Sequence, residues 1–188
     1  MMVLCVSLAS CGSGTISGDP VKYSNADKSF SIELPTANEE AWIINEEAPG
    51  SVLDITDKKD TVNIQVQCIS KSEAQHVAND LVSYKDYSMV NTLADILSQT
   101  ELKDTDVETA DFITDKMAYE FSLEDNVKGT VVFMESEKCY YTFFIMAVDK
   151  AYSANSKVFA ESIASLQELT DTSQGGDSQN DQDSQDNQ

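Results

Sequence analysis

A run of ten residues at 139–148, CYYTFFIMAV, limits the possible folds more than any other part of this sequence. Apart from Thr142, every side chain in the run is apolar or aromatic. A strand with one face in water would alternate polar and apolar residues, and this run does not. The pattern therefore predicts a strand that is buried on both faces at the centre of a sheet. Such a sheet needs a covering layer on each side, so we expect helices to pack on it.

Three further strands are predicted ahead of this run, at Val107–Phe112, Lys116–Leu123 and Lys128–Glu135. The residues from Met117 to Leu123 alternate in polarity, as expected for a strand with one buried face. Short polar segments that are typical of turns, at 124–126 and 136–138, connect consecutive strands. Tight connections of this kind favour antiparallel pairing, so the sequence predicts a meander that ends in the central strand.

Two hairpins are predicted nearer the start of the chain, with strands at Val21–Ser24, Ser29–Leu34, Ser51–Thr56 and Thr61–Ile69. Pro35 is expected to end the first hairpin. In the last of these strands, apolar residues occupy every second position from Val62 to Cys68, and amides occupy the positions between them. We therefore expect one face of this strand in the core and the other in water.

The periodicity between the hairpins and the meander is helical. Apolar residues recur with spacings of three and four from Ala74 to Val82, after Ser72, which can cap a helix. The pattern repeats from Met89 to Leu97, and a last helix is predicted from about Ser153 to Leu169. The predicted fold class is α+β, with a central antiparallel β-sheet flanked by helices.

Two stretches resemble the PsbP/Mog1-like superfamily. SFSIELP at 29–35, with Trp42 downstream, is similar to an early F-x-I-x-x-P … W stretch of its members. The predicted central strand and the helix that follows it, at 139–169, are similar to the buried strand and terminal helix at the C-terminal end of the bacterial members of the superfamily. Many of these bacterial members are lipoproteins. Over residues 21–169 the resemblance implies an α/β/α sandwich. It implies no reaction, because the members act mostly as accessory or assembly factors.

The chain has 188 residues, and this pattern predicts a single α+β domain at 21–169. The segment that follows, 170–188, carries no cation and no large apolar side chain, so we expect a disordered acidic tail. The whole chain has 33 acidic and 12 basic residues, for a net charge of −21, and all the basic residues are Lys. A chain of this charge repels phosphate backbones, which excludes nucleic acid as a partner.

Residues 1–10 are uncharged and mostly apolar, and they are too short to span a bilayer, which takes about 20 apolar residues. They fit the hydrophobic region of a secretory signal peptide. Leu8-Ala9-Ser10-Cys11 is typical of a bacterial lipobox, in which the Cys thiol takes a diacylglyceryl group. Two acyl chains make a stable anchor. We expect a signal peptide at 1–10, membrane lipid attached at Cys11 and a flexible tether at 11–20. The alternative is an ordinary signal peptide, with Cys11 incidental.

Two more cysteines, Cys68 and Cys139, remain after Cys5 leaves with the signal peptide and Cys11 takes the lipid. An even pair in an exported protein can form a disulfide. Bridging requires Cα atoms within about 7 Å, and the sequence does not determine that distance. Two interpretations stay open, a disulfide between Cys68 and Cys139 and two buried free thiols.

Few other residues are candidates for catalysis, ligand binding or metal binding. Trp42, the single Trp, is either part of the core or an aromatic wall of a ligand pocket. His76, the single His, is predicted on a helix with Glu73 and Asp80 at positions i−3 and i+4, which is either a solvated face or a weak metal site. No nucleophile elbow or phosphate-binding loop is present. We expect no catalytic residue, no bound metal and no cofactor.

These features predict a lipid-anchored protein on the extracytoplasmic face of a bacterial cell membrane. The first hypothesis is a non-enzymatic accessory protein that binds a protein or another envelope component. The alternative is a lipoprotein that binds a small ligand near Trp42 and is associated with a transporter. A hydrolase that uses carboxylates is the third and weakest hypothesis.

Overall fold

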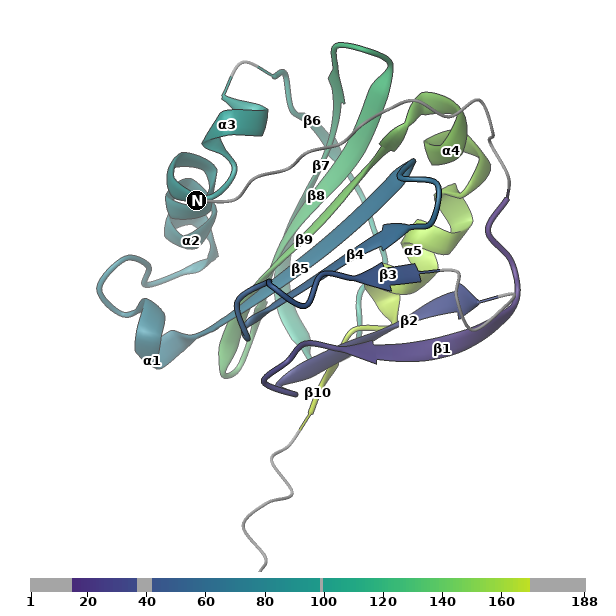
Figure 1. Cartoon of the computed structure of the whole chain (residues 1–188). Coiled ribbons are helices and arrows are strands. Elements are labelled where there is room, and N and C mark those ends of the chain that lie inside the picture. The colour runs from purple at the N-terminus through teal and green to yellow at the C-terminus, as the bar shows by residue number, and fades with distance from the viewer. Residues whose placement is uncertain (1–14, 37–41, 99, 170–188) are drawn as a thin grey trace, which may run out of the picture.

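The computed structural model describes residues 15–36, 42–98 and 100–169 (Figure 1). The strands are β1 (Asp19–Ser24), β2 (Phe30–Thr36), β3 (Trp42–Ile44), β4 (Val52–Asp57), β5 (Val62–Ser70), β6 (Lys103–Thr105), β7 (Ile113–Leu123), β8 (Val127–Ser136), β9 (Cys139–Val148) and β10 (Gln167–Glu168). The helices are α1 (Lys71–Ala74), α2 (Leu81–Asn91), α3 (Ala94–Leu97), α4 (Asp149–Ala154) and α5 (Ser156–Ala164).

A seven-stranded sheet with the order β3-β4-β5-β9-β8-β7-β6 forms the centre of the molecule, and all its pairs are antiparallel. The predicted central strand is confirmed, because β9 lies between β5 and β8 and is buried on both faces. Phe143 and Ile145 belong to the core on one side of the sheet, and Phe144 and Met146 to the core on the other.

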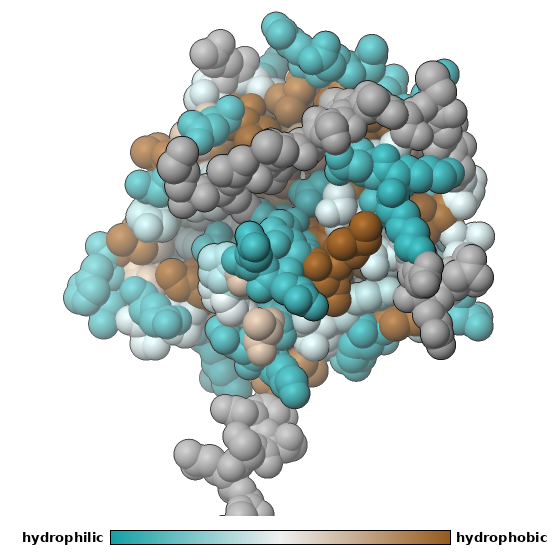
Figure 2. All heavy atoms as spheres, viewed as in Figure 1, coloured by the Kyte–Doolittle hydropathy of each residue, from teal (hydrophilic) through white to brown (hydrophobic). Residues whose placement is uncertain are grey.

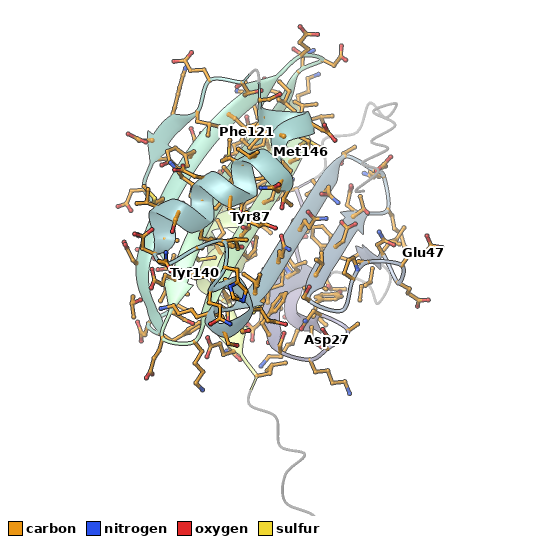
Figure 3. The ribbon with its side chains drawn as sticks, turned by 90° about the vertical axis from the view of Figure 1, so that its left-hand side faces the viewer. Asp27, Glu47, Tyr87, Phe121, Tyr140 and Met146 are labelled. Atoms are coloured by element: carbon orange, nitrogen blue, oxygen red, sulfur yellow. The ribbon has the colours of Figure 1, made fainter. Side chains whose placement is uncertain are left out.

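Different layers cover the two faces of this sheet (Figure 1). Helices α1 to α3 lie on one face, where Leu81 and Tyr84 of α2 join the core that contains Phe144. Figure 3 views this face and shows Phe121, Tyr140 and Met146 on the sheet with α2 lying across it. On the other face lie α4, α5 and a small three-stranded sheet with the order β1-β2-β10. The α+β class is confirmed, and the second covering layer is part sheet and part helix.

The last predicted helix is divided in the structure. Asn155 separates α4 from α5, and its side-chain amide donates back to the carbonyl of Ala151 at 2.8 Å. After α5 the chain becomes extended again, and β10 pairs with Phe30 and Ser31 of β2. The helix therefore ends near Ala164 and not at Leu169, because pairing with β2 satisfies the backbone there.

The helical segment from Ser72 to Val82 is also shorter than predicted. Ser70, not Ser72, caps α1 in a capping box with Glu73, and the helix ends at Ala74. Asp80 caps α2 in a second capping box with Ser83, so a new helix starts within the predicted stripe. Val82, which we expected in the core, is 51% exposed.

Three strand predictions need correction. Val107–Phe112 is not a strand; β7 pairs instead with β6, and Phe112 packs edge-on against Tyr141. Pro35 does not end its hairpin, because β2 continues to Thr36 opposite Asp19. The amide face of β5 is not wet: Asn63 is 7% exposed, and its amide donates to Asp54 at 2.8 Å.

Gly129 of β8 allows two strands and an aromatic ring to come together. A Cβ built on Gly129 would lie 2.2 Å from the ring of Phe121 and 2.4 Å from the carbonyl oxygen of Ile145. Phe121 in turn stacks on Phe144, with ring centroids 5.3 Å apart. A side chain at Gly129 would occupy the space of this aromatic stack, which is why the strand has glycine at this position.

Candidate functional site

The structure brings Cys68 and Cys139 side by side on the same face of the central sheet. Cys68 of β5 lies opposite Tyr141 of β9, and Cys139 precedes Tyr141 by two residues. Residues two apart on a strand share a face, so the two cysteines are diagonal neighbours. Both thiols are free; Cys68 is buried and Cys139 is partly exposed.

The two thiols interact with each other, and their pKa values are shifted in opposite directions. The hydrogen bond from Cys68 lowers the pKa of Cys139 to about 7, although partial burial acts against this. The pKa of Cys68 is raised, first by its hydrogen bond with Cys139 and then by its burial. Cys139 is therefore the thiol that loses its proton first.

A carboxylate and two hydroxyls lie next to this pair. The hydroxyl of Tyr141 donates to Oε1 of Glu168 at 2.9 Å, and the hydroxyl of Ser136 donates to the same oxygen at 2.6 Å. Ser136 Oγ also accepts the backbone N–H of Cys139 at 3.0 Å. Because Glu168 belongs to β10, this cluster fastens the small sheet to the central sheet. Burial raises the pKa of Tyr141, so its hydroxyl remains a donor.

A polar hollow of about 450 Å³ lies elsewhere, between strands β7 and β8 and the segment that holds α4 and α5. Both charges and hydroxyls line it, namely Glu101, Lys103, Glu120, Lys128, Ser122, Tyr152, Ser153 and Ser156. Lys128 pairs with Asp149 at 2.7 Å, and the hydroxyl of Tyr152 lies 2.5 Å from Thr130 Oγ1. These charges and hydroxyls can pair with the polar groups of a small molecule.

The first described residues are fastened next to this hollow. The backbone N–H of Ile16 donates to Oδ1 of Asn155 at 2.6 Å, and Asn155 lies between Ser153 and Ser156 in the chain. The strand β1 then starts at Asp19. Residues from Ile16 onward, which we expected in a flexible tether, are thus attached to the domain. The predicted signal peptide, the lipid site Cys11 and the acidic tail lie outside the described residues.

Trp42 lies in the core and does not line the hollow. Its ring is 7% exposed in the core between the two sheets, and its Nε1–H donates to the carbonyl of Pro35 at 3.0 Å. Of the two interpretations of Trp42, the structure therefore supports a core residue and not the wall of a ligand pocket.

The metal hypothesis at His76 is corrected by the capping geometry. His76 lies in the turn after α1, not on a helix. The carboxylate of Glu73 accepts hydrogen bonds from Ser70, and that of Asp80 accepts them from Ser83; these bonds lower the pKa of both carboxyls. In residues 15–36, 42–98 and 100–169, no group of three or more His, Cys, Asp or Glu side chains is arranged to hold a metal ion.

No helix in the described part of the chain is long and apolar enough to cross a membrane.

The surface that carries α1 to α3 and β3 is mostly hydrophilic, with hydrophobic atoms in small separate groups (Figure 2). Two of the exposed apolar residues, Ile43 and Ile44, lie on the edge strand β3, and two others, Val82 and Val90, lie on α2. Single exposed apolar side chains are ordinary on protein surfaces, so these residues do not define a site.

Comparison with known proteins identifies the fold. No family model matches the chain, and no curated protein matches its sequence. Among solved structures, the solution structure of cyanobacterial PsbP (CyanoP) from Synechocystis sp. PCC 6803 matches with a TM-score of 0.50 and 16% identity. The match covers 86% of this chain and 99% of that one. A Pseudomonas aeruginosa protein of unknown function, described as a putative regulator, matches with a TM-score of 0.41, 12% identity and coverage of 81% and 99%. The fold is PsbP-like, as the sequence resemblance implied.

Proposed function

We propose that this protein is a lipid-anchored accessory protein of the bacterial cell envelope, attached through diacylglyceryl on Cys11 and facing away from the cytoplasm. In this proposal it binds a protein or another envelope component and catalyses no reaction. The lipobox Leu8-Ala9-Ser10-Cys11 supports the anchor. The PsbP-like fold adds no activity, because a fold alone does not specify one.

The lipobox carries the proposal, and the hydrogen bond between Ile16 and Asn155 indicates where a chain anchored at Cys11 would join the domain. Ile16 is five positions after Cys11, and an extended chain spans at most about 3.6 Å per residue. A lipid on Cys11 would therefore hold the end of the domain that carries α4 and α5 within about 18 Å of the membrane surface. The hollow is lined in part by the segment that holds α4 and α5, so a molecule bound in the hollow would lie close to the membrane.

The anchor can be tested with two cysteine variants of the full-length chain expressed in a bacterial host. Wild type is expected in the membrane fraction, with a mature mass that shows loss of residues 1–10 and a diacylglyceryl group on Cys11. Cys11→Ser should remain unmodified and leave the membrane after salt washing. Cys5→Ser is the matched control and should behave as wild type. A Cys11→Ser protein that is processed and retained like wild type would contradict the proposal.

The hollow supports a second candidate function, a lipoprotein that binds a small hydrophilic ligand and is associated with a transporter. Its lining offers cations, carboxylates and hydroxyls within one space of about 450 Å³. Such a volume lies within the range of about 300–1,000 Å³ that small-molecule sites occupy. We place this ligand in the hollow and not at Trp42, whose ring is buried in the core.

Thermal unfolding in a panel of polar metabolites tests this second candidate. A ligand of the hollow should raise the melting temperature of wild type, and this shift should be lost in Lys103→Glu. Lys138→Glu changes the same charge in the turn before β9, outside the lining of the hollow, so it should keep the shift. A panel that never shifts wild type favours the accessory function without a small ligand.

A further inference from the structure

We propose that Cys68 and Cys139 form a disulfide that closes and opens reversibly. Cys139 exchanges with disulfides from outside the protein, and Cys68 completes or reverses the bond. This is a modification site that is independent of the lipid anchor and of the hollow, and it lies at the end of the central sheet where β5 and β9 meet.

The register of β5 and β9 brings the two sulfur atoms within reach of each other. Diagonal neighbours on adjacent strands have Cα atoms about 7–8 Å apart and Cβ atoms somewhat closer. Both thiols are free, and the register places their side chains on the same face of the sheet, close enough for each to shift the pKa of the other. Cys139 opens β9 and lies opposite Ser70, the last residue of β5, where strand ends can adjust more easily than strand centres.

The same geometry makes the bond reversible. Disulfides normally join Cα atoms about 4.4–6.8 Å apart, and diagonal partners lie at the far end of that range or beyond it. Closing the bond therefore pulls the ends of β5 and β9 together, and opening it lets them return. A disulfide under such tension is reduced more readily than one in relaxed geometry.

The two thiols differ in exposure, which assigns their roles. Cys139 is partly exposed, so a disulfide in solution can approach its sulfur. Cys68 is 7% exposed and lies behind it in the core. The pKa of about 7 at Cys139 agrees with this assignment, because it gives a substantial thiolate fraction near neutral pH. Glu168, Tyr141 and Glu73 are the other titratable groups that act on Cys139.

The exchange balances with a low-molecular-weight disulfide such as oxidised glutathione. The thiolate of Cys139 attacks one sulfur of that disulfide, which releases one thiol and leaves a mixed disulfide on Cys139. Cys68 then loses its proton to solvent, and its sulfur attacks the sulfur of Cys139 and releases the second thiol. Two protein thiols are oxidised by two electrons, and one external disulfide is reduced to two thiols. Reduced glutathione runs the same steps backwards.

Redox titration of the purified full-length protein tests reversibility. Samples are equilibrated at increasing ratios of oxidised to reduced glutathione, quenched in acid, blocked with N-ethylmaleimide and digested with trypsin. Cleavage at lysines places Cys68 on peptide 60–71 and Cys139 on peptide 139–150, while Cys5 and Cys11 stay on a separate peptide. The cross-linked pair should rise with the ratio and disappear when the sample is returned to reduced glutathione. A pair that never forms, or that reduced glutathione does not open, overturns the proposal.

Two variants and one rate measurement test the roles of the thiols. Cys68→Ala should accumulate a glutathione adduct on Cys139, because the second step is blocked, whereas Cys139→Ala should leave Cys68 unmodified. Native wild type needs no substitution: iodoacetamide should alkylate Cys139 at least about tenfold faster than Cys68 at neutral pH. An adduct on Cys68 in Cys139→Ala, or faster alkylation of Cys68, would overturn the assignment.

Discussion

The backbone N–H of Ile16 donates to the side chain of Asn155, 139 residues further along the chain, so the entry to the domain is fastened to the residue that divides α4 from α5. Asn155 is 1% exposed and also donates to the carbonyl of Ala151. A single buried side chain thus holds the start of the described chain and shapes the C-terminal helices.

Asn155→Ala should lower the free energy of unfolding by about 1–3 kcal/mol, because it removes the acceptor of the half-buried N–H of Ile16 and one of the two donors to the carbonyl of Ala151. Urea unfolding followed by Trp42 fluorescence measures the loss, since the single Trp is buried in the folded protein. Ser153→Ala, an exposed change two residues earlier in α4, is the control and should cost far less. Equal stabilities of the two variants would argue against a structural role for Asn155.

Gly129→Ala should destabilise the protein by about 1–3 kcal/mol, because the new methyl group would overlap the ring of Phe121 and the carbonyl oxygen of Ile145. Calorimetry of the variant gives the change in melting temperature. The double variant Gly129→Ala/Phe121→Leu removes the ring, so it should recover part of what the two single changes lose together. A melting temperature for Gly129→Ala that equals wild type would show that the strands move apart without cost.

Capping by Asp80 should make stability depend on pH. Hydrogen bonds from Ser83 lower the pKa of Asp80 below its ordinary 3.8. The carboxylate therefore stabilises the folded state fully above pH 3.8, and this contribution is lost as the pH falls through the lower folded pKa. Asp80→Asn keeps an acceptor but has no charge at the helix N-terminus, so it should melt below wild type at neutral pH. The difference should close in acid; a gap that stays constant with pH would contradict the charge effect.

The sequence was sufficient to predict elements whose partners are near in the chain. The alternation marked β5 as a strand, although its amide face is covered as well; the continuous apolar run of β9 follows from burial on two faces, and the hairpin of β1 and β2 follows from its polar turn. Pairing between distant segments was not predictable. Nothing in Gln167 and Glu168 signals a strand, because β10 exists only through pairing with β2 across the molecule.

The candidate sites show the same division. The two cysteines could be named from the sequence, but their contact depends on the register of β5 against β9, which are separated by the helices and the meander. Trp42 and His76 were candidates because each is the single residue of its type. Being single does not place a residue in a binding site: Trp42 lies in the core and His76 in the turn after α1. The hollow could not be predicted, because its lining is assembled from residues 101 to 156, and no local pattern marks it.

Tyr141→Phe should loosen the connection between the two sheets. Tyr141 is fully buried, and its hydroxyl donates to the carboxylate of Glu168 at 2.9 Å, so its removal should cost about 1.5–3 kcal/mol, as for other hydrogen bonds to charged groups. Hydrogen exchange of a peptide that covers β10 measures the local effect, and its protection should fall more than that of β9. Tyr140→Phe is the matched control, because the ring of Tyr140 stacks on Tyr84 on the opposite face of the sheet. If both variants leave β10 equally protected, pairing with β2 alone holds this strand, and the contact between Tyr141 and Glu168 adds nothing to it.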